Sequence, residues 1–376
     1  MSQTAVAATL MRGGTSKGVF FLPQDLPPAQ PERDRLFLAV IGSPDPYERQ
    51  INGMGGATSS TSKICIVGGS SRTDADVDFT FGHVDIMRPV IDYTGNCGNL
   101  LSAVGVFAIE QRLVPATPPL TRIRVWQTNL QQHLVVSVPT HTDGSVIVEG
   151  ETAVAGVAGS GSPIAVDFLH PKDVPTFPTG NRADAVSITA SGAITTTLLQ
   201  AGNPTVFALA SDFGLRGDEL PHELTRIGHT IEQLRCAGGA AMGMGTPEQI
   251  GDQPATPKVC LLAPPGPYTT SAGARIPALS INIQARMFSM GLPHNSITGT
   301  GTVALGVAAC IPGTIVADIA NPRRRDDYNV TRIGHSAGVT EVSARFDDKT
   351  GEAISATVIR TARTLMRGEV LVPTGN

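Results

Sequence analysis

Hydrophobic and polar positions alternate over short stretches along most of the chain, a pattern typical of half-buried β-strands. The alternation predicts strands at residues 63–67, 77–85, 122–126, 134–138, 146–149, 195–199, 206–210, 258–263, 276–288 and 353–360. Because 41 glycines and 28 prolines are spread along the sequence, these strands are expected to be joined by tight turns. Many strands with few helices indicate an α+β fold rather than a doubly wound parallel sheet.

Helical periodicity is confined to four segments, residues 31–41, 98–112, 221–237 and 301–309. Two of them echo each other. Asn96-Cys97-Gly98-Asn99 opens a helix of small apolar residues, and Gly299-Thr300-Gly301-Thr302 opens a similar one that Pro312-Gly313 ends. Small side chains let such helices pack centrally against a sheet.

The length also predicts more than one hydrophobic core, since 376 residues exceed the roughly 250–300 residues at which single cores stop growing. Together with the two similar helix starts, this length predicts two halves, residues 1–180 and 181–376. The proline-containing segment 168–186 is the expected linker between them.

Composition and charge argue against several classes of function. The net charge is −4 and aromatic residues make up only 5%, which argues against nucleic-acid binding. The basic run Arg323-Arg324-Arg325 is followed by Asp326-Asp327 and is expected on a solvated loop. No apolar stretch reaches 18 residues and the first ten residues do not form a secretory signal, so no membrane span and a cytoplasmic location are expected.

The five cysteines are scattered and form no C-x-x-C pair, so neither a zinc site nor a disulfide framework is expected. Neither the G-x-S-x-G element of serine hydrolases nor a dinucleotide-binding glycine motif is placed as those functions require. A zinc knuckle, serine-hydrolase chemistry and nicotinamide binding are therefore not expected.

Lysine is scarce, with five residues among 28 lysines and arginines, and two lysines lie in glycine-rich motifs. In the first, around Gly14, Thr15, Ser16 and Lys17, paired glycines free backbone N–H groups to bind an anion, and the side chains add donors and a charge. A tight turn into the first strand explains the motif equally well.

The second motif runs from Gly53 through Ser62 to Lys63, which begins an apolar strand. Apolar neighbours are expected to desolvate Lys63, and desolvation lowers the pKa of a lysine toward that of a general base. The alternative is a lysine at a strand end that keeps its ammonium group in water.

Cys97 lies in the first turn of a predicted helix, where the helix dipole stabilises a thiolate and free N–H groups can bind a carboxylate. A buried structural cysteine is the alternative, and the two interpretations are equally supported. Weaker candidates are Asn203 and His294, together with segments 178–181 and 335–336, where ordinary turn chemistry is a sufficient explanation.

Read in order, these motifs resemble the PrpF-type family, known for 2-methylaconitate cis–trans isomerase. The resemblance rests on R-G-G-T-S-K-G (12–18), G-S-P-D-P (42–46), Q-I-N-G-M-G-G-A-T-S-S-T-S-K (50–63), D-V-D (76–78), G-N-C-G-N (95–99), P-T-G-N (178–181), I-P-G-T (311–314) and R-T-A-R (360–363). It implies a diaminopimelate epimerase-like fold: two similar α+β halves, each a mixed or antiparallel sheet around a central small-residue helix, with the active site in the interdomain cleft. It also implies a small unsaturated di- or tricarboxylate substrate and no cofactor, and it leaves a homodimer open.

By the same resemblance, the family's essential lysine corresponds to Lys63 and its cysteine to Cys97. The family's anion-binding segments correspond to residues 14–17, residues 96–99 and the second helix start at Thr300. The predicted substrate-binding residues are Gly14, Thr15, Ser16, Lys17, Ser62, Asn96, Gly98, Asn99, Asn203, His294, Thr300 and Gly301. Two departures bear on the substrate: Asn52 stands where the family has an acidic residue, and segment 334–338 reads G-H-S-A-G.

The expected chemistry starts with Lys63, as a free amine, removing a proton γ to a carboxylate through the intervening C=C. Reprotonation at the other allylic carbon shifts the double bond, and rotation before the proton returns gives cis–trans isomerisation. Best guesses for the substrate are 2-methylaconitate and aconitate, with methylitaconate and 4-oxalomesaconate as alternatives. Epimerisation by Cys97 and a partner is disfavoured because the second half offers Thr300 where a second cysteine is needed. A non-catalytic carboxylate-binding protein is the alternative from another class.

Overall fold

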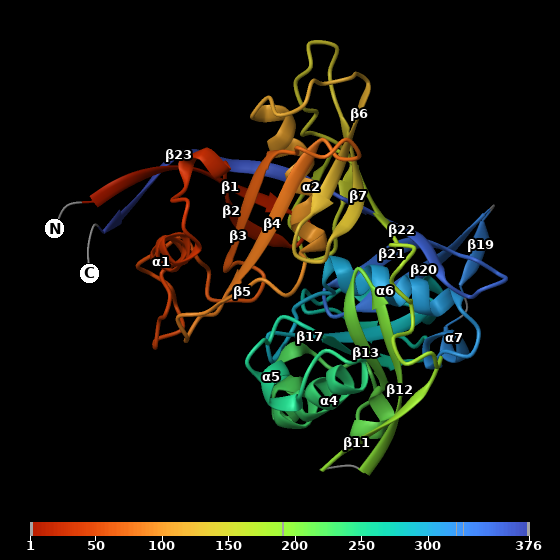
Figure 1. The fold of residues 1–376 in the computed structure, drawn as a ribbon. Helices are drawn as coiled ribbons and strands as arrows, with labels where there is room; N and C mark the ends of the chain where they lie inside the picture. Colours follow the sequence, from red (N-terminus) through yellow and green to blue (C-terminus); the bar gives the residue numbers. More distant parts are fainter. Residues whose placement is uncertain (1–2, 190–191, 321, 326, 374–376) are drawn as a thin grey trace. The chain divides into compact units, whose positions relative to one another are not determined.

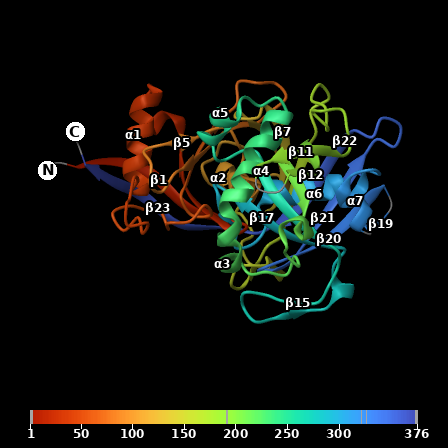
Figure 2. The same ribbon diagram turned by 90° about the horizontal axis from the view of Figure 1, so that it is seen from below.

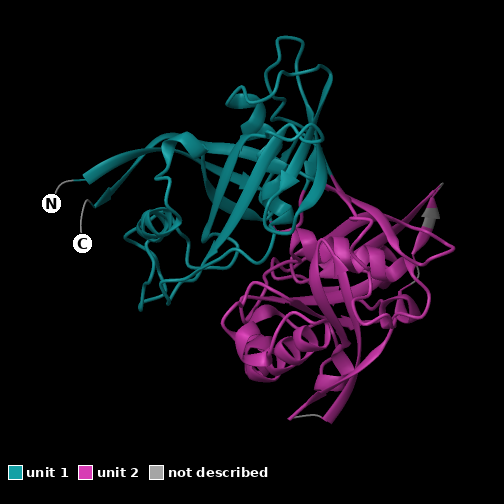
Figure 3. Cartoon of the chain, viewed as in Figure 1, with its two compact units in different colours: residues 1–153, 157–166, 360–376 teal, residues 154–156, 167–359 magenta. Residues whose placement is uncertain are grey.

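The computed structural model describes residues 3–189, 192–320, 322–325 and 327–373, and the chain divides into two compact units (Figures 1 and 3). Unit 1 comprises residues 1–153, 157–166 and 360–376, and unit 2 comprises residues 154–156 and 167–359. This division differs from the expected boundary at 180/181. Residues 360–376 return to unit 1 because β23 (Ala362–Pro373) pairs antiparallel with β1 (Gln3–Gly13) from end to end.

Unit 1 is a mixed sheet with two helices. Its other strands are β2 (Ser16–Phe21), β3 (Lys63–Gly69), β4 (Val77–Val84), β5 (Ile91–Asp92), β6 (Leu120–Gln127), β7 (Gln132–Pro139), β8 (Thr152–Ala153) and β9 (Ser160–Gly161), and β10 (Ile164–Leu169) continues into unit 2. The main order is β1-β2-β3-β4-β6-β7, in which only β2–β3 and β4–β6 are parallel.

The helix α2 (Gly98–Glu110) lies at the centre of unit 1, and its residues from Gly98 to Ile109 are all buried. It contacts β23, β1, β2, β3 and β7, strands from both ends of the sheet, so the sheet wraps around it. Small residues make this possible: a methyl group at Gly105 would lie 2.6 Å from Val136 of β7. The central helix of the first half is therefore confirmed.

The outer face of the unit 1 sheet is covered by α1 (Gln30–Ile41), which follows the short 3-10 helix η1 (Pro23–Asp25). Phe37, Val40 and Ile41 of this helix join one apolar cluster with Val19 and Phe21 of β2. The sheet of unit 1 thus has a core on each face.

Unit 2 repeats the topology of unit 1. Its strands are β11 (Asp184–Ile188), β12 (Gly192–Ala201), β13 (Asn203–Leu209), β14 (Lys258–Ala263), β15 (Tyr268–Thr269), β16 (Arg275–Ile276), β17 (Ile283–Ser289), β18 (Leu292–Pro293), β19 (Arg323–Arg325), β20 (Tyr328–His335), β21 (Gly338–Phe346) and β22 (Ala353–Arg360). The order β12-β13-β14-β17-β20-β21 has the same alternation of parallel and antiparallel pairs as β1-β2-β3-β4-β6-β7.

The helices of unit 2 follow the same plan. They are α3 (Pro221–Leu224), α4 (Gly228–Ala241), α5 (Pro247–Gly251), α6 (Gly299–Cys310) and α7 (Ile315–Ile319), with 3-10 turns η2 (Ala210–Phe213), η3 (Thr225–Ile227) and η4 (Ala278–Ser280). The fully buried α6 contacts β12, β13, β20 and β21, as α2 contacts its strands in unit 1. On the other face, α4 packs against β11, β13 and β14 (Figure 2).

Several sequence expectations were wrong in detail. Segment 146–149 forms only an isolated bridge from Val146, because its backbone hydrogen bonds go to separate segments rather than to one neighbouring strand. The strand expected at 276–288 is interrupted by η4 after Pro277, and the helix expected at 221–237 is interrupted by η3.

Two segments taken for connections are structured. Within the expected linker 168–186, Phe177 is buried and the N–H of Thr176 donates to the Glu352 carboxylate at 2.7 Å, so this segment belongs to unit 2. The run Arg323–Arg325 is not loop but β19, paired with β20, whereas Asp326 lies outside the described residues. Of the helices in the described part of the chain, none is both long enough and apolar enough to cross a membrane.

Candidate active site

The first glycine-rich motif forms the turn of the β1–β2 hairpin. Gly13 pairs with Ser16, so Gly14 and Thr15 make the two-residue connection, with Gly14 at a φ of +49°. The hairpin places the Ser16 hydroxyl in the buried interior, where it is 2% exposed. Lys17 points to the opposite face of the strand, because successive side chains of a strand alternate. The motif is thus a tight turn that delivers Ser16.

Lys63 is the first residue of β3, and its side chain is only 6% exposed. Its Nζ donates to Ser16 Oγ at 2.9 Å and to Cys97 Sγ at 3.2 Å. The ring of Phe81 lies on another side, with its centroid 5.8 Å from Nζ. The expected desolvation of Lys63 is confirmed, and it brings the amine against a thiol.

Cys97 is the N-cap residue of α2, and its sulfur lies 3.8 Å from Ser16 Oγ. Burial by itself raises the pKa of Cys97. The positive charge of Lys63, the backbone N–H of Leu100 and the hydrogen bonds from Lys63 and Ser16 act in the other direction. Together they bring the pKa of Cys97 below its ordinary value of 9.0. The three side chains form what we call the Lys63–Cys97–Ser16 cluster, in which the contacts of Cys97 with Lys63 and Ser16 favour its thiolate form.

A second line of buried polar contacts runs beside this cluster. Arg360, which is 4% exposed, donates from Nε to Asn99 Oδ1 at 3.0 Å, and Asn99 Nδ2 donates to Thr15 Oγ1 at 2.9 Å. Burial lowers the pKa of Arg360 to about 10. Sequence reasoning did not single out Arg360, although it opens the R-T-A-R motif.

The C-terminal segment also holds the hairpin turn directly. Arg12 Nη1 donates to the carbonyl of Thr361 at 2.8 Å, and the N–H of Gly14 donates to the same carbonyl at 2.9 Å. A side chain on Gly14 would collide with the Asn99 amide. The turn, the first turn of α2 and residues 360–361 are therefore fixed together in unit 1.

The remaining predicted site residues lie in several places. Asn96 is buried next to Cys97, and Gly98 is the first residue of α2. Ser62 is buried too, but its hydroxyl donates to Gln50 Oε1 at 2.6 Å. No hydrogen bond found in the described residues joins Ser62 to the Lys63–Cys97–Ser16 cluster.

The predicted residues of the second half belong to unit 2. Asn203 is the first residue of β13, and His294 precedes α6 with its Nδ1 accepting from the N–H of Ser296 at 3.1 Å. Thr300 and Gly301 lie in the first turn of α6, and the N-cap of that helix is Thr298. Counting from the N-caps, Cys97 corresponds to Thr298 rather than to Thr300. Gly105 and Gly306 confirm this alignment, since each lies eight residues after its N-cap and faces a valine of the equivalent strand, β7 or β21.

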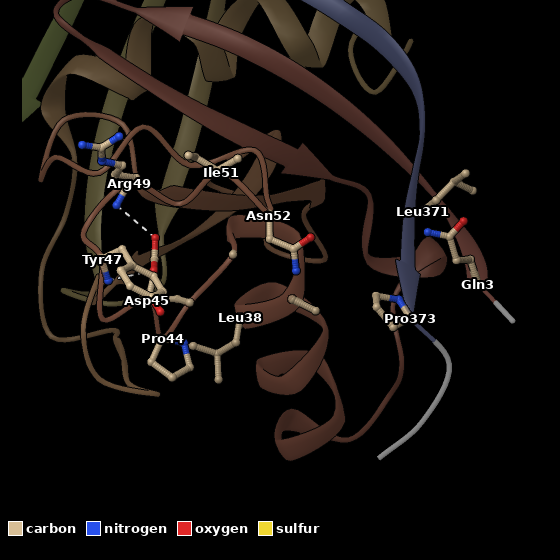
Figure 4. A pocket seen from close by; sticks show the side chains of 13 residues that line it. Gln3, Leu38, Pro44, Asp45, Tyr47, Arg49, Ile51, Asn52, Leu371 and Pro373 are labelled. Atoms are coloured by element: carbon tan, nitrogen blue, oxygen red, sulfur yellow. Dashed lines mark hydrogen bonds between the residues drawn. The ribbon is translucent and has the colours of Figure 1, made fainter. Parts of the chain in front are cut away.

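A hollow of about 860 Å³ lies elsewhere in unit 1 (Figure 4). Its lining includes Asn52 and the exposed side chains of Tyr47 and Ile51, but neither Lys63 nor Cys97. Asn52, which replaces an acidic residue of the family, therefore lines this hollow. Its replacement carries little information about the chemistry of the Lys63–Cys97–Ser16 cluster. No group of three or more His, Cys, Asp or Glu residues in the described ranges is arranged to hold a metal ion.

Known proteins match this chain along nearly its whole length in sequence, and one of them in structure. The family described as PrpF protein matches residues 3–373. A 2-methyl-aconitate isomerase of Shewanella oneidensis is 41% identical over 391 aligned positions, which cover 99% of this chain and 98% of that protein. The crystal structure of a methylitaconate-delta-isomerase superposes with a TM-score of 0.79 at 36% identity, covering 99% of this chain and 96% of that one.

More distant structures share the fold alone. A hydroxyproline epimerase from Agrobacterium vitis superposes with a TM-score of 0.58 at 13% identity, covering 98% of this chain and 92% of that one. The match to the family, over residues 3–373, spans every described residue and so includes both repeats. The chain belongs to the PrpF family and is an isomerase.

Proposed function

We propose that this isomerase moves a C=C bond in a small unsaturated di- or tricarboxylate, with 2-methylaconitate or aconitate as its preferred acid. The buried Lys63–Cys97–Ser16 cluster is the observation that carries the proposal, because it pairs an amine with a thiol of lowered pKa. The choice of acid is supported by the 41% identity to a 2-methyl-aconitate isomerase.

In the proposed reaction, Lys63 and Cys97 act as a coupled pair. Transfer of a proton from the Lys63 ammonium to the Cys97 thiolate over 3.2 Å generates a free amine and a thiol. The amine then removes a proton from the carbon γ to a carboxylate, so that Lys63 is protonated again and the substrate becomes a dienolate. Transfer of that proton from the Lys63 ammonium to the other allylic carbon completes the shift of the double bond. If the transient single bond rotates and the proton returns to the original γ carbon, the product is the geometric isomer. In both cases Lys63 is left as a free amine, and the proton of the Cys97 thiol returns to it to restore the starting pair.

The dienolate carries extra negative charge, which the site must stabilise. The N-terminus of α2, with its backbone N–H groups and dipole, is suited to this, and the buried guanidinium of Arg360 adds positive charge beside Asn99. Proton transfer by a positioned group contributes about 10²–10⁴-fold to a rate. Much of the acceleration must therefore come from this stabilisation.

The test is proton NMR of the protein in D₂O with cis- and trans-aconitate, 2-methylaconitate, methylitaconate, itaconate and oxalomesaconate. Deuterium incorporation with movement of the vinyl signals for 2-methylaconitate or aconitate is the expected result. Turnover of methylitaconate alone would instead make the protein a delta-isomerase like the structural relative. A folded protein that shifts its melting temperature with these acids but exchanges no deuterium would be a binding protein, and the proposal would fail.

A further inference from the structure

A row of buried polar side chains crosses the sheet of unit 1 beside Lys63, on the strands β3, β4 and β5 (Figure 1). Lys63 pairs directly with His83 in the antiparallel ladder of β3 and β4, and His83 pairs directly with Asp92 in that of β4 and β5. The exposed fractions are 6% for Lys63, 4% for His83 and 5% for Asp92. Directly opposite residues of antiparallel strands have Cβ atoms about 4.5–5.5 Å apart. An amine, an imidazole and a carboxylate are therefore neighbours on one face of the sheet.

That face is the inner one, which α2 covers. Their strand neighbours Ile64, Val84 and Ile91 belong to the apolar cluster on the opposite, outer face, and side chains of a strand alternate between faces. The contact of Lys63 with Cys97, the N-cap of α2, agrees with this placement. The strand β5 is only two residues long and follows the exposed residues 87–89. The row therefore runs from the Lys63–Cys97–Ser16 cluster toward the surface of unit 1.

Neighbouring side chains hold the members of this row. The ring of Phe81 has its centroid 5.8 Å from Nζ of Lys63 and 6.1 Å from that of the His83 ring, which it meets edge to face. Thr94 fixes the carboxylate, because its N–H and its hydroxyl both donate to Asp92 Oδ1, at 2.8 Å and 2.6 Å. Thr94 belongs to the segment that leads into α2. The row is thus built into the same framework as the thiol.

Burying a carboxylate is costly unless other groups compensate its charge. Two carboxylates of the described residues are almost fully buried, Asp92 and Glu219. Glu219 accepts hydrogen bonds from the backbone N–H groups of residues 216 and 217, whereas Asp92 lies beside a histidine. A carboxylate next to a histidine orients the ring, and a neutral imidazole accepts a proton at one nitrogen while it releases one from the other. The pair of His83 and Asp92 is therefore suited to carry a proton.

We propose that His83 and Asp92 relay protons between the Lys63 ammonium and solvent while the dienolate is bound. Lys63 gives a proton to one imidazole nitrogen, and the other nitrogen gives its proton to the Asp92 carboxylate. Lys63 is then a free amine, His83 is neutral and Asp92 is a carboxylic acid, which exchanges its proton with water. The reverse transfers return a solvent proton to Lys63, so no net charge moves. The relay rests on the proposed function, in which the substrate supplies the proton on Lys63.

The test follows an accepted acid that is deuterated at its γ carbon and converted in ordinary water. With the relay, the deuterium on Lys63 is lost to solvent before reprotonation, so wild type should transfer almost none of it to the product. In His83→Gln the deuterium stays on an ammonium group with three equivalent hydrogens, so up to about one third should be transferred. Proton NMR and mass spectrometry of the product measure this fraction. His133→Gln, which removes a half-buried histidine elsewhere in unit 1, is the control and should behave as wild type.

The transferred fraction separates a relay from a merely structural role. A folded His83→Gln that converts the acid more slowly but transfers as little deuterium as wild type overturns the proposal, and so does a wild type that itself transfers about one third. If His83→Gln does not fold, Asp92→Asn takes its place with the same expected outcomes, because it keeps an oxygen for the hydrogen bonds of Thr94.

A measurement without substrate keeps the relay testable if wild type turns over none of the acids and the proposed function fails by itself. Cys97 and Lys63 are both buried and 3.2 Å apart, so ionisation of Cys97 after a pH jump should also use the relay. Stopped-flow absorbance of the thiolate reports this ionisation. A rate at least about tenfold lower in His83→Gln than in His133→Gln supports the relay, and equal rates overturn it.

Discussion

Lys63 lowers the cost of a negative charge on the buried thiol of Cys97. Burial alone raises the pKa of Cys97, and the positive charge of Lys63, whose Nζ lies 3.2 Å from Sγ, acts against this. At that distance a proton can pass directly between the two groups, and the net charge of the pair does not change. The proposed reaction uses this transfer to generate a free amine.

The thiolate of Cys97 should be directly observable. Because the pKa of Cys97 in the folded protein lies below 9.0, the absorbance of the thiolate near 240 nm should appear at a lower pH than for an ordinary thiol. The difference spectrum of wild type minus Cys97→Ser isolates this residue. In Lys63→Met the attraction is lost while burial remains, so the transition should move to higher pH.

The lowered pKa of Cys97 also determines how this residue makes the stability of the protein depend on pH. A pKa lowered by folding means that ionisation of Cys97 favours the folded state. The stabilisation is complete above the unfolded value of 9.0 and is lost as the pH falls through the folded pKa. If the thiolate absorbance of Cys97 in wild type appeared at the pH of an ordinary thiol or higher, the pairing of Cys97 with Lys63 would be contradicted.

Arg360 is predicted to hold the turn of α2 in place through Asn99. Replacement by Met leaves the buried Asn99 amide oxygen without this donor, which should cost unit 1 about 1–3 kcal/mol of unfolding free energy. Trp126 is the only tryptophan and lies in β6, so its fluorescence in urea reports unit 1. Arg363→Met, which replaces an exposed arginine nearby, is the control, and its unfolding free energy should change little. Equal stability of the two variants would show that Arg360 is not structurally coupled to this site.

At the scale of the elements, α2 and α6 were the most predictable parts of the fold. Both are runs of small apolar residues; α2 is buried from Gly98 to Ile109, and α6 is buried along its whole length. The long strand β23 was not predictable in the same way. Most of its side chains are exposed, so its sequence has little of the alternation that identifies a half-buried strand. The strand is instead fixed by its pairing with β1, from the other end of the chain, which a local sequence pattern does not reveal.

The packing of α2 gives a prediction that opposes helix propensity. Alanine at Gly105 favours the helix by about 1 kcal/mol, but its methyl group would lie 2.6 Å and 2.8 Å from Val136 and Val138. Overpacking of a core costs about 1–3 kcal/mol, so Gly105→Ala should lower the stability of unit 1 in urea. Gly69→Ala adds the same methyl group in open space on β3 and is the matched control. A stabilised Gly105→Ala would show that the sheet does not close tightly on the helix.

At the scale of the molecule, the candidate site could be predicted only in part from the sequence. Lys63, Ser16 and Cys97 stand in glycine-rich motifs, and these motifs marked all three as candidates before their contacts were known. Arg360 was missed because it reaches Asn99 across 261 residues of chain, a separation that no local pattern records.

The most direct measurement of the central claim is deuterium incorporation into the accepted acid by Lys63→Met in D₂O, followed by proton NMR. Lys172→Met serves as the control and a circular dichroism spectrum confirms the fold. If Lys63 carries the proton, the variant should incorporate deuterium at least 10²-fold more slowly, while the control keeps the wild-type rate. Full incorporation by a folded Lys63→Met would contradict the account.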